Sequence, residues 1–132
     1  MTKRILLVDD EFSILFAYKK VLQCPDVLID AAESREEALR LLDENDYQAA
    51  ILDLSLHGST GEEGFELVSL IREKYGNPKI TIIMITAYGT PEIKDQAYKL
   101  GADYYFEKPV STNTIRDALE SAGITMPHAV NG

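Results

Sequence analysis

The segment Ala49-Ala50-Ile51-Leu52-Asp53-Leu54 joins an uninterrupted apolar run to a carboxylate close to its end. A short apolar run of this kind predicts a strand that is buried on both faces of a sheet. Burying a charged group is unfavourable unless another group compensates the charge, so Asp53 requires a partner or a function. The segment therefore predicts a central strand that delivers one acidic side chain to the edge of a sheet.

Three other apolar segments also run into polar side chains. They are residues 4–8, which run into Asp9 and Asp10, residues 80–85, which run into Thr86, and residues 103–106, which run through Glu107 into Lys108. Sheets of parallel strands bind their ligands at the carboxyl ends of the strands. We therefore expect carboxylates, a hydroxyl and an ammonium from distant parts of the sequence to form one site.

Amphipathic segments alternate with the strands. A further strand is expected at 27–32, and helices are expected at 11–23, 34–45, 65–75, 90–100 and 111–122. The first of these helices has an apolar stripe that includes Tyr18 and Val21, and Ser34, Thr90 and Ser111 are predicted N-caps. Strands that alternate with helices predict an α/β fold with a parallel sheet, helices on both faces and right-handed crossovers.

The predicted topology also suggests where a ligand binds. If the strands lie in the order 2-1-3-4-5, the order reverses between the first and third strands, and ligands bind at such a switch point. The ends of those two strands carry Asp9, Asp10 and Asp53. The acidic residues therefore converge where the fold predicts a site.

The composition is that of a soluble globular protein with one hydrophobic core. The 132 residues are 45% hydrophobic and 27% charged, and we expect one domain at residues 1–122 and a short C-terminal tail at 123–132. The net charge of −9 argues against nucleic-acid binding by this domain, which requires a basic surface. A single cysteine excludes an internal disulfide, and no apolar run approaches the ~20 residues of a membrane helix. Since its start lacks a signal-peptide pattern, we expect the chain to be cytoplasmic and to make no membrane contact.

The three aspartates at the predicted strand ends repel one another unless one binds a proton or a cation neutralises them. Magnesium suits such a group because it prefers oxygen ligands, retains several waters and often shares its site with phosphate. Asp53 could then attack a phosphoryl group and form an aspartyl phosphate. Lys108 would supply a positive charge, and the Thr86 hydroxyl would donate a hydrogen bond to a phosphate oxygen.

Each of these residues has a simpler interpretation when it is considered alone. Asp9 and Asp10 are equally consistent with a turn pair that caps the following helix. Thr86 alone is more often a strand-end hydroxyl bonded to backbone, and Lys108 alone is more often a solvated lysine. Their joint placement at predicted strand ends favours the phosphate site.

Four segments carry a resemblance to a known family. They are Leu7-Val8-Asp9-Asp10-Glu11, Ile51-Leu52-Asp53-Leu54, Ile85-Thr86-Ala87 and Phe106-Glu107-Lys108-Pro109. From about Lys3 to Ala122, the chain resembles the receiver domains of bacterial two-component response regulators, the chemotaxis regulators among them. The resemblance implies a flavodoxin-like, doubly wound (βα)5 three-layer sandwich with a five-stranded parallel sheet in the order 2-1-3-4-5.

The resemblance also implies a phospho-acceptor switch of a two-component phosphorelay. Asp53 would take a phosphoryl group from a histidine of a sensor histidine kinase or of a histidine phosphotransfer protein. Mg²⁺ would be held by Asp9, Asp10, Asp53 and the backbone carbonyl of Ser55. Thr86 and Lys108 would contact the phosphoryl group.

The switch implied by the resemblance consists of Thr86 and Tyr105, which would change the surface around the fourth helix and the fifth strand. The alternative for Tyr105 is an ordinary half-exposed strand aromatic. Such a domain is no enzyme beyond its own phosphoryl transfer and autodephosphorylation. A monomer or weak dimer is expected.

Two features stand apart from the shared motifs. Family members usually carry proline four residues beyond the acceptor, where this chain has His57, and Gly64-Phe65-Glu66-Leu67 arrives three residues later than expected. The loop at 57–64 is therefore expected to be longer than usual. Phe12 and Phe16, on the outer side of the first predicted helix, suggest a docking patch for the phosphate donor, with scattered exposed aromatics as the equal alternative.

Three other functions compete with this interpretation. A pseudo-receiver, which would be a phosphorylation-independent protein-binding module, is left open by the altered loop. A haloacid dehalogenase-type enzyme would require a second acid two residues after the nucleophile, where this chain has Ser55. A flavodoxin-like flavin binder would require a loop rich in Ser, Thr and Gly after the first strand, where this chain has Asp9-Asp10-Glu11. The intact acids, Thr86 and Lys108 favour the receiver.

Overall fold

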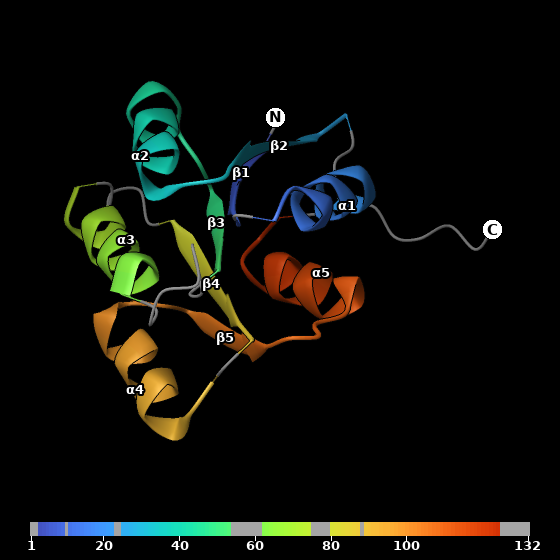
Figure 1. The fold of residues 1–132 in the computed structure, drawn as a ribbon. Helices are drawn as coiled ribbons and strands as arrows, with labels where there is room; N and C mark the ends of the chain where they lie inside the picture. Colours follow the sequence, from blue (N-terminus) through green and yellow to red (C-terminus); the bar gives the residue numbers. More distant parts are fainter. Residues whose placement is uncertain are drawn as a thin grey trace.

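The computed structural model describes residues 3–9, 11–22, 25–53, 62–74, 80–87 and 89–124, and for 12–16 and 62–63 it describes the backbone alone. Strands and helices alternate along the chain (Figure 1): β1 (Lys3–Val8), α1 (Phe12–Leu22), β2 (Val27–Ala32), α2 (Arg35–Glu44), β3 (Ala49–Asp53), α3 (Glu62–Lys74), β4 (Thr81–Thr86), α4 (Pro91–Leu100), β5 (Tyr104–Glu107) and α5 (Thr112–Ser121). All paired strands are parallel, and the sheet order is β2-β1-β3-β4-β5. The predicted doubly wound fold and its strand order are therefore confirmed.

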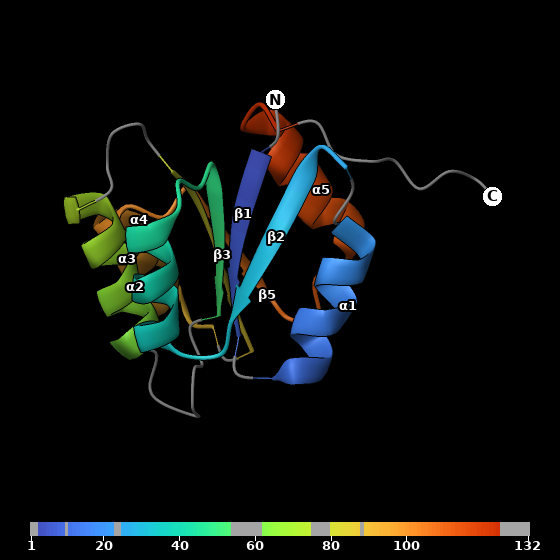
Figure 2. The same ribbon diagram turned by 90° about the horizontal axis from the view of Figure 1, so that it is seen from above.

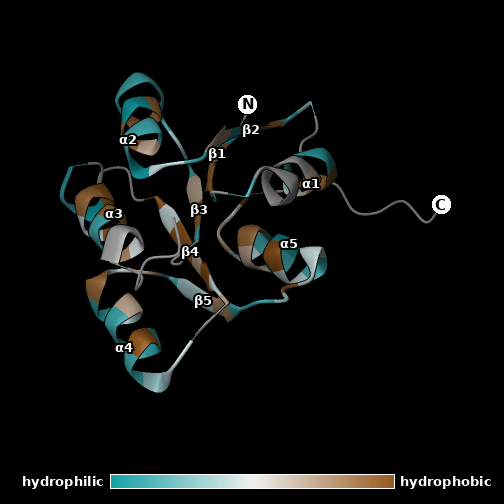
Figure 3. Ribbon diagram, in the orientation of Figure 1, coloured by the Kyte–Doolittle hydropathy of each residue, from teal (hydrophilic) through white to brown (hydrophobic). Residues whose placement is uncertain are grey.

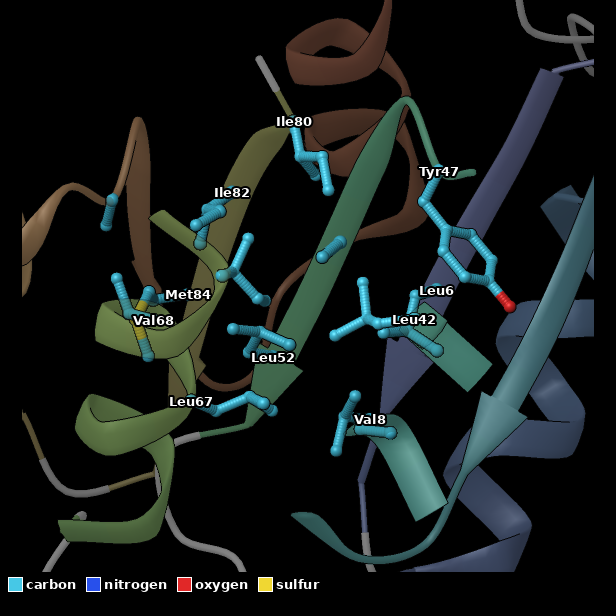
Figure 4. Packing of buried hydrophobic residues seen from close by; sticks show 14 of the residues in the cluster. Leu6, Val8, Leu42, Tyr47, Leu52, Leu67, Val68, Ile80, Ile82 and Met84 are labelled. Atoms are coloured by element: carbon cyan, nitrogen blue, oxygen red, sulfur yellow. The ribbon is translucent and has the colours of Figure 1, made fainter. Parts of the chain in front are cut away.

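The helices form two layers that enclose the sheet. Figure 2 shows α2, α3 and α4 against one face and α1 and α5 against the other. Successive side chains of a strand point to opposite faces, so the strands supply two cores. Leu6 and Leu52 pack beneath α2, α3 and α4, as Figure 4 shows, whereas Leu7 and Ile51 pack beneath α1 and α5.

Burial on both faces explains the apolar run that precedes Asp53. All five residues of β3 are buried. Figure 3 shows hydrophobic residues along the central strands and hydrophilic residues on the outer faces of the helices. A polar side chain can therefore avoid the apolar cores most easily at the end of a central strand.

The predicted helix starts are confirmed by their capping hydrogen bonds. The hydroxyls of Ser34, Thr90 and Ser111 each accept a hydrogen bond from a backbone N–H three residues later, at 3.1, 3.2 and 3.1 Å. The Glu37 carboxylate accepts from the Glu33 N–H at 2.8 Å, which completes a local capping pair. These caps satisfy amides that a helix start leaves without an internal partner.

Some element boundaries differ from the prediction. The structure begins α3 at Glu62 rather than Phe65, so the predicted loop at 57–64 is wrong in its last three residues. Acidic residues in a first helical turn complement the helix dipole, which favours a start at Glu62 in spite of Gly64. β4 and β5 each lie one residue later than predicted, so Thr86 and Glu107 are the last residues of their strands.

The predicted apolar stripe of α1 is wrong at Val21. This side chain is 40% exposed, whereas Leu22 beside it is fully buried and Tyr18 is half-buried. Val21 lines a groove at the edge of α1 instead of entering the core. Helical periodicity alone cannot place the edge of a buried face, because it does not specify how far a neighbouring helix extends.

The packed structure continues past the last helix. Ile124 is 2% exposed in the core beneath α1 and α5, and its N–H donates to the Leu119 carbonyl at 3.0 Å. Gly123 adopts a positive φ of 89°, as is common at helix ends. The described packing therefore includes two residues beyond the predicted domain boundary. Within the described part of the chain, no helix has the length and apolar character needed to cross a membrane.

Arg72 joins α3 to the carboxyl end of α4. Its guanidinium donates to the Gly101 carbonyl from Nε at 2.9 Å and from Nη2 at 2.7 Å, and Nη2 also contacts Asp103 Oδ2 at 2.7 Å. The same carboxylate oxygen accepts the Ile82 N–H at 2.9 Å. Because Gly101 has a positive φ of 120° and a side chain there would collide with Arg72, the end of α4 is closely fitted to this guanidinium.

We expect Arg72→Met to lower the free energy of unfolding by about 2–4 kcal/mol, because it removes the cationic partner of Asp103 and the charged donor to the Gly101 carbonyl. Urea unfolding followed by circular dichroism measures this change. The control is Arg40→Met on α2, whose ion pair with Glu44 is solvent-exposed and should contribute less than about 0.5 kcal/mol. Equal losses of unfolding free energy in Arg72→Met and Arg40→Met would contradict a stabilising role of Arg72 at the end of α4.

Candidate functional site

Four of the predicted site residues lie at the carboxyl edge of the sheet. Asp53 ends β3, Thr86 ends β4, Asp9 follows β1 and Lys108 follows β5. Asp9 and Asp53 are each 4% exposed and Thr86 is 2% exposed, whereas the Lys108 side chain is 21% exposed. The structure therefore brings together two buried carboxylates, a buried hydroxyl and an ammonium that reaches them from the rim.

Lys108 bridges the two carboxylates. Its Nζ lies 3.0 Å from Asp53 Oδ2 and 3.6 Å from Asp9 Oδ2. The backbone places it there, since the Lys108 N–H donates to the Thr86 carbonyl at 2.8 Å and so continues the pairing of β4 with β5. The other oxygen of Asp9, Oδ1, accepts the Glu11 N–H at 3.0 Å.

The electrostatics of this cluster favour a further cation. Burial raises the pKa of Asp9 to about 6 and the Asp53 charge adds to the rise, while the Glu11 N–H and Lys108 oppose it. Burial alone would lower the pKa of Lys108, but its hydrogen bond to Asp53 and the charges of both aspartates raise it above the ordinary value. Lys108 therefore stays protonated, and Asp9 is ionised only at a cost.

The residues present fit Mg²⁺. Among the described residues, two carboxylates face one ammonium, and carboxylate oxygens are the ligands that magnesium prefers. In the part of the chain that is described, no group of three or more His, Cys, Asp or Glu side chains gathers as a metal site. The other predicted ligands, Asp10 and Ser55, lie outside the described residues, as does His57.

Tyr105 is buried. It is 7% exposed, so the alternative of a half-exposed strand aromatic is wrong. Its ring packs against Tyr98 of α4, with centroids 6.5 Å apart and an interplanar angle of 51°. Among the described residues, no group forms a hydrogen bond with its hydroxyl. Burial, followed by the charge of Glu107 and by Tyr98, raises the pKa of this phenol.

A groove beside the site was missed by the sequence analysis. It has a volume of about 510 Å³ and lies between α1 and the segment after β5, lined by Ala17, Tyr18, Val21, Lys108, Pro109, Val110 and Thr112. The Tyr18 hydroxyl donates to the Val110 carbonyl at 3.4 Å across it. The sequence contains no separate signal for this groove, because the helical spacing of Val21 predicted a buried side chain.

Phe12 and Phe16 were predicted as a docking patch, but the structure describes only the backbone of these two residues. The patch therefore stays a prediction. The groove begins one residue beyond them along α1, at Ala17.

Comparison with known proteins identifies the family. Residues 5–120 match the family model of the response regulator receiver domain. The chain belongs to this family. The receiver domain is 36% identical over 112 residues to the transcriptional regulatory protein ResD of Bacillus subtilis, covering 85% of this chain and 44% of that protein. It is 32% identical over 106 residues to the heme response regulator HssR of Staphylococcus haemolyticus, covering 80% of this chain and 45% of that protein. The chain thus spans less than half the length of both relatives.

Solved structures of response regulators share the fold of this receiver domain. A CheY-like receiver domain protein from Methanospirillum hungatei has a TM-score of 0.79 at 28% identity, covering 93% of this chain and 98% of that one. The chemotaxis protein CheY4 of Vibrio cholerae has a TM-score of 0.81 at 26% identity, covering 92% and 99%. A response regulator of Burkholderia pseudomallei, whose structure contains a phosphorylated aspartic acid, a calcium ion and citrate, has a TM-score of 0.79 at 26% identity, covering 92% and 69%.

The raised pKa of Asp9 predicts how Asp9→Asn changes stability with pH. A carboxyl group whose folded-state pKa is about 6, against 3.8 ordinarily, stabilises the folded state at low pH, and this stabilisation is lost as the pH rises from about 4 to 6. With a chelator present, Asp9→Asn should therefore be more stable than the parent above pH 6, by on the order of 1–3 kcal/mol. Urea unfolding across this pH range measures the difference.

Two comparisons accompany this measurement. Asp95→Asn, at an exposed position on α4, should show no such pH-dependent gain. Millimolar magnesium should stabilise the parent above pH 6 more than it stabilises Asp9→Asn, because the metal offsets the charge repulsion. If the difference in unfolding free energy between Asp9→Asn and the parent did not change with pH, this account of the site would be contradicted.

Proposed function

We propose that this receiver domain is a phospho-acceptor switch whose Asp53 takes a phosphoryl group from a phosphohistidine of a sensor histidine kinase or of a histidine phosphotransfer protein. Receiver domains of response regulators are phosphorylated by histidine kinases. The observation that carries the assignment to Asp53 is the Lys108 ammonium, 3.0 Å from this buried carboxylate at the end of a central strand. The phosphorylated aspartic acid in the structure of the Burkholderia relative supports it.

In the proposed reaction an oxygen of the Asp53 carboxylate attacks the phosphorus atom. The bond between phosphorus and the donor imidazole nitrogen breaks, its electron pair returns to nitrogen, and an aspartyl phosphate forms. Lys108, already beside Asp53, stabilises negative charge on the phosphoryl oxygens, and the Thr86 hydroxyl donates a hydrogen bond to one of them. Asp9, Asp10, Asp53 and the Ser55 carbonyl would hold Mg²⁺, which when bound neutralises the carboxylates and the incoming phosphate.

The domain is proposed to act on itself alone. Water would later hydrolyse the aspartyl phosphate, which returns the carboxylate and releases phosphate. Such a cycle resets a switch and converts no separate substrate, so the domain is not proposed to be an enzyme. Its signal would pass through Thr86 and Tyr105 to the surface around α4 and β5, because Tyr105 packs against Tyr98 of α4.

The output is proposed to lie in another domain or partner protein. The relatives named as regulators are more than twice as long as the match, so the receiver domain is one part of them. A net charge of −9 disfavours direct nucleic-acid binding by this domain, and we propose a cytoplasmic monomer or weak dimer.

The pseudo-receiver remains the alternative function. It would use the same fold as a phosphorylation-independent binding module. The observation against it is the retention of two buried carboxylates with a bridging lysine, since burying these charges is unfavourable without a use for them.

The first test is incubation with acetyl phosphate and magnesium, followed by intact-mass analysis. We expect one phosphoryl adduct on the parent and on Asp95→Asn, and none on Asp53→Asn or when a chelator replaces magnesium. Lys108→Ala should be labelled about 10²-fold more slowly, because it removes the cation that stabilises the transferred phosphoryl group. A parent that takes no adduct under any of these conditions would favour the pseudo-receiver.

The groove between α1 and the segment after β5 is the proposed docking site for the protein donor. Most of its lining side chains are apolar, and Lys108, which also lines it, contacts Asp53, so a protein seated on the groove could direct an imidazole at Asp53. Val21 is 40% exposed on its wall.

A panel of purified, autophosphorylated histidine kinases is first screened for one that phosphorylates the parent. With that kinase as donor, we expect Val21→Glu to slow phosphotransfer. The expected slowing is about tenfold or more, because a charge replaces apolar contact area. Labelling by acetyl phosphate should be unchanged, since that donor needs no groove. Leu28→Glu, at a similarly exposed apolar position on β2 (39% exposed), is the control and should transfer at the parent rate. Equal slowing in both variants would argue against a specific docking groove.

A further inference from the structure

Gly89, in the connection between β4 and α4, lies against the buried end of Tyr105. A β-carbon built at Gly89 would overlap the Tyr105 hydroxyl oxygen and would lie 2.7 Å from Glu107 Oε1. The space that a side chain at position 89 would fill is thus the space that the phenol occupies.

Backbone conformation does not explain a glycine here. The described glycines with positive φ are Gly101 and Gly123, and Gly89 is not among them. An alanine at position 89 is therefore compatible with the backbone. The three atoms nearest to the added β-carbon all belong to the ends of the Tyr105 and Glu107 side chains, and none belongs to the backbone. The constraint on Gly89 is therefore space for these side chains.

Two opposed contributions act on the buried position of Tyr105. Burying the aromatic ring is favourable, and the ring gains a contact with Tyr98. Leaving its hydroxyl without a hydrogen-bond partner among the described residues is unfavourable. These contributions oppose each other, so the space available to the side chain also helps to decide where the ring lies.

We propose that Gly89 is a positioning residue for the switch: the absence of a side chain at this position is what admits Tyr105 to its buried place beneath the β4–α4 connection. A β-carbon there holds the ring outward, toward solvent. The role of Tyr105 as a switch rests on the proposed function, but the control of its position by Gly89 does not.

Hydroxyl-radical footprinting with peptide mass spectrometry tests this proposal on the full chain without phosphate. Tyr105, at 7% exposure, is the residue measured, and Tyr98, at 43% exposure, is the exposed reference. We expect the modification rate of Tyr105, relative to Tyr98, to rise several-fold in Gly89→Ala. Ala87→Ser adds an atom at an exposed position of the same connection and should leave Tyr105 protected. Protection of Tyr105 in Gly89→Ala at the parent level would overturn the proposal.

A rescue variant separates lack of space from general disturbance of the connection. Only the hydroxyl of Tyr105 is among the three nearest atoms, so its ring carbons lie at least 3.0 Å from the added β-carbon. In Gly89→Ala/Tyr105→Phe the ring should therefore return inward, and position 105 should regain its protection. If Gly89→Ala does not fold, folding of the double variant supports the proposal. Failure of both to fold overturns it, because the backbone would then require glycine.

The outcomes also separate this inference from the proposed function. A parent that takes no phosphate from acetyl phosphate would refute the proposed function and leave the footprinting result intact. If the parent is phosphorylated, we expect phosphorylation to change the modification rate of Tyr105. This change should be absent from Gly89→Ala and should return at position 105 in Gly89→Ala/Tyr105→Phe. If phosphorylation changed the Tyr105 modification rate in Gly89→Ala as much as in the parent, Gly89 would not be a positioning residue for the switch.

Discussion

The ion pair between Lys108 and Asp53 is the interaction on which the site depends, because it makes the burial of acidic side chains tolerable. Asp9 and Asp53 are each 4% exposed, and an unpaired charge at this depth would be strongly destabilising. Lys108 reaches both carboxylates from the rim. One ammonium cannot neutralise both, so burial still raises the pKa of Asp9. The site is thus stable enough to form and negative enough to attract a cation.

That pairing exists because a parallel sheet brings distant strand ends together. Lys108 and Asp53 are 55 positions apart in the sequence, and β4 lies between their strands. The bond from the Lys108 N–H to the Thr86 carbonyl extends the β4–β5 pairing past Glu107, which turns the ammonium toward the end of β3. Helices cover both faces of the sheet, so polar groups gather where the strands end.

Sequence patterns predicted the features that depend on local chemistry. The run before Asp53 is buried on both faces, and the caps at Ser34, Thr90 and Ser111 form as their residue types require. The burial of individual side chains that depends on one particular neighbour was not predictable. Val21 satisfies the helical period yet lines a groove, because the period does not specify how far α5 reaches. The burial of Tyr105 depends on empty space at Gly89, which no pattern around either residue encodes.

The lysine of the site and the aromatic residue of the proposed switch lie three positions apart, at the end of β5 and within it. Tyr105 points into the core beneath α4, Phe106 toward α5, and Lys108 follows at the carboxyl end of β5. A change in charge at Asp53 therefore acts on a segment three residues from Tyr105. Arg72 holds the carboxyl end of α4 through the Gly101 carbonyl, so that end resists movement. In the proposed switch, a displacement of Tyr105 would reach α4 at two places, through Tyr98 in its carboxyl-terminal half and through Gly89 next to the Thr90 cap.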